Sequence, residues 1–215
     1  LVGDLRLFAN CEQRSSGTQN EFSEYSSERQ RVIKPEFFAE TGRIPTSRNT
    51  MTYLRYAEAL NRAGYPQSAF LILKHGMCYD NLVVYVDSVE RVAAAELVDF
   101  DANIFPKDHT FGIHSRGSGD SHINEYYTLP MPTDSLATRQ DTIDYQIPLV
   151  EDMIIDEMAL EGAFEGYRYY DLMRVALRRN DASYLAAPIS RRNGEEDAAL
   201  RAKLEDTSNW YLPLP

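Results

Sequence analysis

The sequence predicts a mainly α-helical fold in which helix pairs are joined by long irregular loops. Two stretches carry apolar residues at three- and four-residue spacing, and a long polar stretch rich in glycine and proline separates them. A helix pair is expected at about residues 50–76, a loop-rich insertion at about residues 77–149, and a helical closing segment at about residues 150–215. These parts are expected to belong to a single domain, or a portion of one, over residues 1–215.

The helix pair is the first strong signal along the chain. Thr50 can cap the start of its first helix. Gly64 suits the left-handed conformation that ends a helix, and Pro66 suits the first turn of the next one, which Gly76 then ends. The pair resembles one tetratricopeptide unit, but no second copy follows about 34 residues later. Because solenoids need about three repeats, partner helices are expected elsewhere in the chain or in a preceding part of a longer protein.

The segments around this pair give weaker signals. Residues 1–49 are polar and irregular, which predicts an extended loop with short strands, for example at residues 36–39. Prolines and glycines break any period over residues 99–120, and two prolines favour an extended conformation over residues 126–132. The pattern over Leu82–Val98 is ambiguous. One interpretation is a helix at Asp87–Leu97 with four apolar residues on one side: Val89, Val92, Ala93 and Leu97.

The closing segment carries the second strong signal. Residues 135–148 show no clear period, so helix is expected from Val150 onward, as far as Arg179. Gly162 and Gly166 interrupt the apolar pattern, which leaves two helices and one bent helix as alternatives. A charged helix at about residues 195–204 and an extended tail at residues 211–215 are expected to follow.

Composition excludes several classes of protein. The chain has 22 Lys and Arg against 33 Asp and Glu, a net charge of −11. This balance opposes binding to nucleic acid phosphates or to anionic lipids. No apolar run is long enough to span a bilayer. Cys11 and Cys78 could form one disulfide or remain two buried thiols, and the chain begins at Leu1, as expected for a piece of a longer protein.

Candidate catalytic groups do not converge on one site. Glu157, Glu161 and Glu165 share one face of a continuous helix, where carboxylates can hold metals or transfer protons. Arg168 follows Glu165 by three residues, as Arg174 follows Asp171, so an ion-paired structural face is favoured. We therefore expect no catalytic residues and no enzyme activity.

No cofactor or metal site is expected either. Three histidines of the loop-rich insertion lack the spacing of a compact zinc motif: His109, His114 and His122. The alternation of Asp99, Asp101 and Asn103 resembles the start of a calcium loop, but Ile104 stands where that loop needs glycine. Residues 117–120 are rich in glycine, yet they lack the Lys-Ser/Thr pair of a phosphate loop.

Three segments of the chain carry a family resemblance: Tyr53–Gly64, Asp156–Arg174 and the tail Tyr211–Pro215. Together they resemble the C-terminal half of the SusD/RagB family of outer-membrane nutrient-binding lipoproteins. Gly112–Asp120 is similar to a loop found in some members. The likeness covers roughly residues 50–215. Its structural motif residues are Gly64, Pro66, Glu161, Glu165, Gly166, Arg168 and Asp171.

This resemblance implies a function as well as a SusD-like fold with tetratricopeptide-like pairs. Members lie on the cell surface of Bacteroidetes, anchored by a lipidated N-terminal cysteine that this chain does not contain. They capture glycans or peptides and pass them to a SusC/RagA-like TonB-dependent transporter. The expected function is therefore non-catalytic nutrient binding with an oligosaccharide or peptide ligand. A helical-repeat module that only holds partner proteins is the main alternative, and a hydrolase is the third.

Ligand contacts are predicted from the residues themselves. The chain has 14 Tyr, 9 Phe and 1 Trp, and tyrosine pairs an apolar face with a polar tip that suits wet binding surfaces. Aromatic platforms hold sugars, and loops rich in Tyr, Ser, Gly and Asn also suit peptides. Ordinary packing is the alternative for each of the candidates, which are Tyr25, Tyr79, Tyr126, Tyr127 and Trp210.

Overall fold

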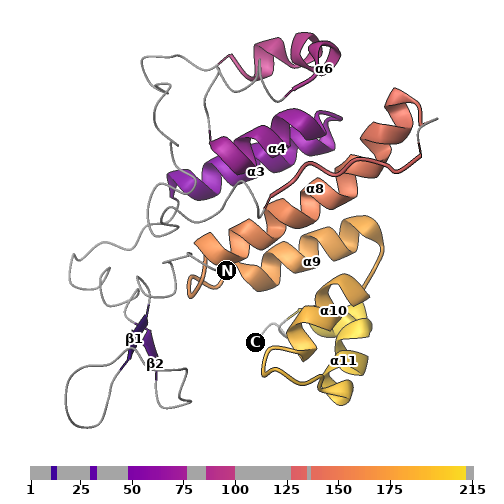
Figure 1. The fold of residues 1–215 in the computed structure, drawn as a ribbon. Helices are drawn as coiled ribbons and strands as arrows, with labels where there is room; N and C mark the ends of the chain where they lie inside the picture. Colours follow the sequence, from indigo (N-terminus) through magenta and orange to yellow (C-terminus); the bar gives the residue numbers. More distant parts are fainter. Residues whose placement is uncertain are drawn as a thin grey trace. The chain divides into compact units, whose positions relative to one another are not determined.

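The structure is a computed structural model that describes residues 11–13, 30–32, 48–76, 86–99, 127–134 and 137–211. Within these residues the chain is mainly helical, which confirms the predicted fold class (Figure 1). The chain divides into two compact units, Leu1–Phe164 and Glu165–Pro215, which we describe separately as the first and the second unit. In the part of the chain that the structure describes, no helix combines the length and apolar character needed to cross a bilayer.

The predicted helix pair is present in the first unit as α3 (Asn49–Arg62) and α4 (Pro66–His75), which pack against each other (Figure 1). Gly64 has a φ of +94°, the left-handed conformation expected for the turn, and Pro66 is the first residue of α4. The expectation that Thr50 caps α3 is wrong. The helix begins at Asn49, so Thr50 lies inside its first turn, and the cap position belongs to Arg48.

The long helix α8 (Arg139–Glu161) packs against both members of this pair. It begins well before Val150, where the sequence analysis placed its start, and it continues through Pro148. Thr138 accepts a hydrogen bond from the Asp141 backbone N–H, and the Asp141 carboxylate accepts one from the Thr138 N–H, so the pair forms a capping box. The helices enclose an apolar core that includes Leu54, Ala57, Leu71, Ile72, Val150, Ile154 and Met158.

The remaining described parts of the first unit are short. The expected helix at Asp87–Leu97 is divided into α6 (Ser88–Ala93) and η1 (Ala95–Leu97). Residues 127–132 are not helical, as expected, and run beside α8 (Figure 1). Strands β1 (Cys11–Gln13) and β2 (Gln30–Val32) pair antiparallel with Cys11 opposite Val32, in agreement with short strands in this region. The strand expected at residues 36–39 lies outside the described residues.

The second unit contains α9 (Arg168–Arg179), α10 (Ser183–Ser190), α11 (Ala198–Glu205) and the short η2 (Thr207–Trp210). Because α8 ends at Glu161, the alternative of two separate helices is confirmed. Phe164 and Gly166 both have positive φ angles, 65° and 82°, in the turn between them. Neither α10 nor η2 was expected from the sequence. Residues 212–215 of the expected extended tail lie outside the described part of the chain.

Candidate functional site

Two tyrosine side chains are exposed in the second unit. Tyr170 lies in the first turn of α9 with 61% of its surface exposed, and Tyr211 directly follows η2 with 62% exposed. Tyr170 contacts the ring of Tyr169, whose hydroxyl bonds to the backbone of Trp210, the residue before Tyr211, so the three tyrosines are neighbours. We call Tyr169, Tyr170 and Tyr211 the tyrosine cluster. Exposed phenol rings of this kind can stack on a ligand and also exchange hydrogen bonds with it.

The tyrosine cluster is held by contacts within the second unit. The hydroxyl of Tyr169 donates a hydrogen bond to the backbone oxygen of Trp210 at 3.0 Å, which links α9 to η2. The rings of Tyr169 and Tyr170 meet edge to face, with centroids 5.8 Å apart and an interplanar angle of 89°. This arrangement is a favoured aromatic geometry, so the first turn of α9 presents a defined aromatic surface.

Trp210 anchors the other side of the cluster. It is 4% exposed, and its Nε1–H donates to the backbone oxygen of Leu204 at 2.6 Å. Asp206 accepts a hydrogen bond from the Ser208 N–H at 3.0 Å and so caps η2. Tyr211 therefore follows a short helix that is fixed at both ends. A ring that is already positioned loses less conformational entropy when a ligand binds.

The protonation state of Tyr169 suits its role as a donor. Burial, and to a lesser extent the neighbouring phenols of Tyr170 and Tyr211, raise the pKa of Tyr169 above its ordinary value. Because that ordinary value is already about 10, the hydroxyl stays protonated near neutral pH. Its hydrogen bond to the Trp210 carbonyl is therefore kept under physiological conditions.

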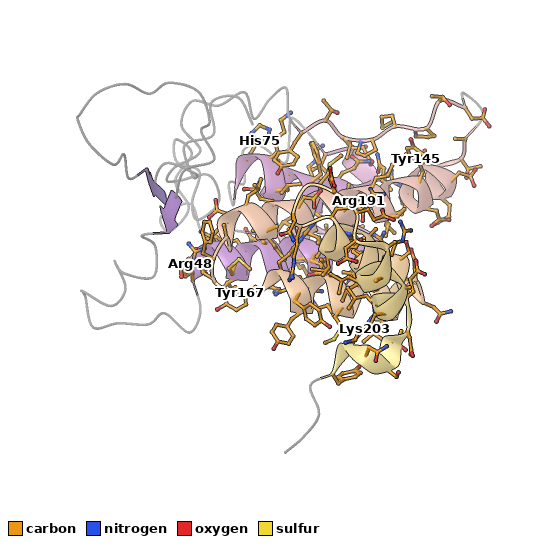
Figure 2. All side chains as sticks on the ribbon, turned by 90° about the horizontal axis from the view of Figure 1, so that it is seen from below. Arg48, His75, Tyr145, Tyr167, Arg191 and Lys203 are labelled. Atoms are coloured by element: carbon orange, nitrogen blue, oxygen red, sulfur yellow. The ribbon has the colours of Figure 1, made fainter. Side chains whose placement is uncertain are left out.

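The second unit carries no excess charge. Residues 165–215 contain eight basic residues (Lys and Arg) and eight acidic ones (Asp and Glu). Residues 1–164 contain 14 basic and 25 acidic residues. The net charge of −11 therefore belongs entirely to the first unit. Several charges of the second unit also neutralise each other in ion pairs: Arg191 and Arg201 each pair with Glu196, and Arg201 pairs with Glu205 (Figure 2 labels Arg191). Net charge thus favours neither an anionic nor a cationic ligand at the tyrosine cluster.

The structure describes two of the five predicted ligand-binding residues, and it buries both. Tyr127 is 3% exposed, its hydroxyl donates to Glu157 Oε2 at 2.5 Å, and its backbone oxygen accepts from Lys74 Nζ at 2.8 Å. Trp210 is the buried anchor described above. For these two residues the packing alternative describes the structure, and neither ring is open to a ligand. Tyr25, Tyr79 and Tyr126 lie outside the described residues.

The sequence analysis did not single out Tyr170 or Tyr211 as ligand-binding residues, although Tyr211 is adjacent to Trp210. A signal was present for Tyr170. Tyr169 and Tyr170 are consecutive in a helix, and successive helical residues point in different directions. When one ring of such a pair packs inward, the other is directed away from it. A consecutive tyrosine pair at a helix start therefore indicates one structural and one exposed ring.

The acidic residues of the closing motif have structural positions. Glu157 and Glu161 lie on α8 and are buried, but α8 ends at Glu161, so the expectation of one face shared with Glu165 is wrong. Asp171 is 2% exposed and accepts from Arg174 Nε at 3.2 Å, which confirms that ion pair. A pairing between Glu165 and Arg168 stays a prediction.

Other buried carboxylates of the first unit also have structural partners. Arg62 on α3 donates from Nε to Glu151 Oε1 on α8 at 3.0 Å and forms a second ion pair with Glu58. Arg48, at the start of α3, donates from Nη2 to the backbone oxygen of Glu161 at 2.5 Å (Figure 2). These contacts join α3 to α8. They use these buried charges for helix packing, so among the described residues the tyrosine cluster is the candidate site.

Among the described residues, no group of three or more His, Cys, Asp or Glu side chains is placed to hold a metal ion. The histidines at 109, 114 and 122 lie outside the described part, as do Asp101, Asn103 and the glycine-rich residues 117–120. Cys78 also lies outside it, so the two alternatives for the cysteines stay open.

Comparisons of the chain with known protein families, with curated proteins and with solved structures give no match. The resemblance to the SusD/RagB family therefore rests on the motifs themselves. The first, Tyr53–Gly64, forms most of α3 and the turn that follows it. The second, Asp156–Arg174, comprises the end of α8, the turn with Gly166, and the first part of α9.

Proposed function

We propose that this chain is a non-catalytic nutrient-binding protein of the SusD/RagB type, which captures oligosaccharides or peptides for import. The observation that carries the proposal is the tyrosine cluster, where Tyr170 and Tyr211 each expose more than half of their surface beside the anchored Tyr169. The motif resemblance supplies the second support. Capture requires contact surface and hydrogen bonds, so it needs no catalytic group.

The chemistry of the tyrosine cluster suits both ligand classes. A phenol ring can cover the apolar C–H face of a pyranose or the side chain of a proline or aromatic residue, while its hydroxyl exchanges hydrogen bonds with the ligand. Tyrosine does this at low entropic cost because it has few rotatable bonds. The absence of net charge in the second unit gives a charged ligand no electrostatic gain, which is compatible with neutral sugars and mixed peptides.

The cellular setting belongs to the same proposal and rests on the motif resemblance alone. We place the protein at the cell-surface side of the outer membrane, held there by a lipid anchor. Its partner would be a SusC/RagA-like TonB-dependent transporter that receives the captured ligand. Neither location nor partner depends on the geometry of the tyrosine cluster.

The alternative function is a helical-repeat module that holds partner proteins and binds no small ligand. The α3–α4 pair, with its tight turn at Gly64, favours this alternative because such pairs build repeat scaffolds. The two functions differ in one observable. A nutrient-binding protein binds an oligomer on its own, whereas a scaffold does not.

A glycan and peptide array, probed with the full chain, tests the proposal. We expect binding to at least one neutral oligosaccharide or mixed peptide. A Tyr170→Ala/Tyr211→Ala variant should lose about thirtyfold in affinity, because each ring contributes about 1 kcal/mol. Tyr145→Ala is the matched control, because Tyr145 is 44% exposed on α8 and outside the cluster (Figure 2). No binding to any array member would contradict nutrient capture and favour the scaffold.

A further inference from the structure

Helix α6 and η1 turn apolar side chains toward solvent. Val89 is 58% exposed, Val92 75% and Leu97 43%, and we call these three residues the α6 apolar face. Val89 and Val92 belong to α6, and Leu97 belongs to η1, which follows it after Ala94. On α6 the buried residue is instead the acidic Glu90, which is 1% exposed. A surface helix of a globular protein normally has the opposite arrangement.

The inward side of α6 is fixed by polar contacts to α4. Glu90 Oε1 accepts a hydrogen bond at 2.7 Å from the backbone N–H of Ser68, in the first turn of α4, where no cap side chain is present. Gln67 and Asp87 pair in both directions: Gln67 Nε2 donates to Asp87 Oδ2 at 2.6 Å, and the Asp87 N–H donates to Gln67 Oε1 at 2.9 Å. Glu90 thus serves as a cap for a helix other than its own.

Two further contacts hold the ends of this segment. Arg139 at the start of α8 donates from Nη1 to both carboxylate oxygens of Asp87, each at 2.8 Å. The hydroxyl of Tyr56 on α3 donates to the backbone oxygen of Leu97. Contacts from α3, α4 and α8 therefore fix the segment from its N-terminal cap to its last turn.

This set of contacts determines which side of α6 faces outward. Rotating the helix to bury the valines would remove the carboxylate from the Ser68 N–H and break the Gln67–Asp87 pair. Buried polar groups that lose their partners are costly, whereas exposed apolar side chains on a monomer are tolerated. The outward orientation of the α6 apolar face is consequently a stable property of the fold. Val89 and Val92 lie three residues apart on α6 and are therefore neighbours on its surface, and neighbouring exposed apolar side chains mark a site of association.

Charge indicates what this face can bind. Glu96 and Asp99 are exposed beside it, and neither forms an ion pair with another described residue. The first unit also holds the whole net charge of −11, which would repel a second copy of the chain. We infer that the α6 apolar face docks a polypeptide segment that carries apolar side chains flanked by Lys or Arg. The inference goes beyond ligand capture and uses no residue of the tyrosine cluster.

The probes for this inference are two synthetic amphipathic helical peptides with the same leucine positions, one with lysine and one with glutamate at the polar positions. We expect the full chain to bind the lysine peptide and not the glutamate peptide. Val92→Ser should weaken that binding by about tenfold, because it removes a central apolar contact. Glu96→Lys should weaken it by about fivefold, as expected for one exposed charge pair.

A matched control distinguishes docking from general charge attraction. Glu195→Lys makes the same charge change at an exposed position of the second unit and should leave peptide binding unchanged. Equal losses in Glu195→Lys and Glu96→Lys, or no loss in Val92→Ser, would overturn the inference. Because Val92 is 75% exposed, its replacement should not affect folding, which circular dichroism can verify.

Two measurements test whether the chain itself or a second copy of it covers the α6 apolar face instead. If Val92→Cys in the free chain resists maleimide labelling at that position, the chain itself covers the face and the inference fails. Sedimentation of the wild type at high concentration should show a monomer. A dimer that Val92→Ser dissociates would assign the face to a second copy and would also contradict the inference. Neither result affects the binding of an oligosaccharide or peptide in the array, so this inference and the proposed function can be refuted independently.

Discussion

Arg62 joins two buried carboxylates at the contact between α3 and α8, and its removal should destabilise the first unit strongly. Its Nε donates to Glu151 Oε1 at 3.0 Å, and the same guanidinium pairs with Glu58. The side chains of Glu151 and Glu58 are 0% and 4% exposed, so Arg62→Ala would leave both without this cation. Breaking a buried pair in this way costs about 3–5 kcal/mol.

The structure places the expected cost at the lower end of that range. The Arg62 side chain is 32% exposed, so water can partly replace it. For a chain of this length, 3 kcal/mol corresponds to a fall of about 6–12 °C in melting temperature. Urea unfolding of the wild type and of Arg62→Ala at neutral pH measures the free energy of unfolding directly.

Arg55→Ala is the matched control, because Arg55 is the same residue type on the same helix. Its Nη1 lies 3.7 Å from Glu58 Oε2 and its side chain is 39% exposed, so this pair should contribute under about 1 kcal/mol. If Arg62→Ala costs no more than Arg55→Ala, the interpretation of Arg62 as the link between two buried carboxylates is refuted.

Three further predictions concern the turn of the helix pair, the buried acid of α6, and the ligand. Gly64→Val should lower the free energy of unfolding by more than about 1 kcal/mol, because Gly64 has a φ of +94°, which a β-branched residue tolerates poorly. No atom lies within 4 Å of the added Cβ, so this cost is backbone strain and not a clash, and an unchanged unfolding curve would contradict it. Burial raises the pKa of Glu90, and the Ser68 N–H offsets only part of that effect. The folded protein therefore binds the proton more tightly than the unfolded chain, in which the pKa of Glu is about 4.3. The wild type should gain stability relative to Glu90→Gln as the pH falls from 7 toward that value. Urea unfolding across this range checks the sign, and a constant difference between the two proteins would argue against it. Binding of a neutral oligosaccharide or mixed peptide should depend only weakly on salt, because such a ligand makes few charge contacts for salt to screen. A steep loss of affinity with salt for an anionic ligand would contradict this and indicate a site at Lys107–Arg116, a cationic and glycine-containing stretch of the predicted loop-rich insertion.

Local signals in the sequence predicted local structure well. Gly64 and Pro66 have backbone preferences that hold in almost any surroundings, so the turn of the helix pair was predictable. The start of α8 was missed because Pro148 breaks the expected pattern and the preceding residues are largely exposed. The spacing of Thr138 and Asp141 was the available signal, since it gives the helix a capping box.

Features that depend on distant contacts could not be predicted. The burial of Glu90 requires the uncapped start of α4, which lies about twenty residues earlier in the chain, so no periodicity within α6 reveals it. The candidate site shows the same limitation. Aromatic residue type and loop composition selected Tyr127 and Trp210, but both use their polar atoms within the chain and are buried. In the described part of the second unit, the exposed tyrosine rings are the two that packing left outside, Tyr170 and Tyr211.

Chemical footprinting of tyrosine tests the central claim of ligand capture most directly. The full chain is iodinated with and without a saturating amount of the strongest ligand from the array, and the modified tyrosines are identified by mass spectrometry. Tyr170 and Tyr211 should react in the free protein and be protected when the ligand is bound, while Tyr145 should react equally in both. If the bound ligand leaves Tyr170 and Tyr211 reactive and protects other tyrosines instead, capture at the tyrosine cluster is contradicted.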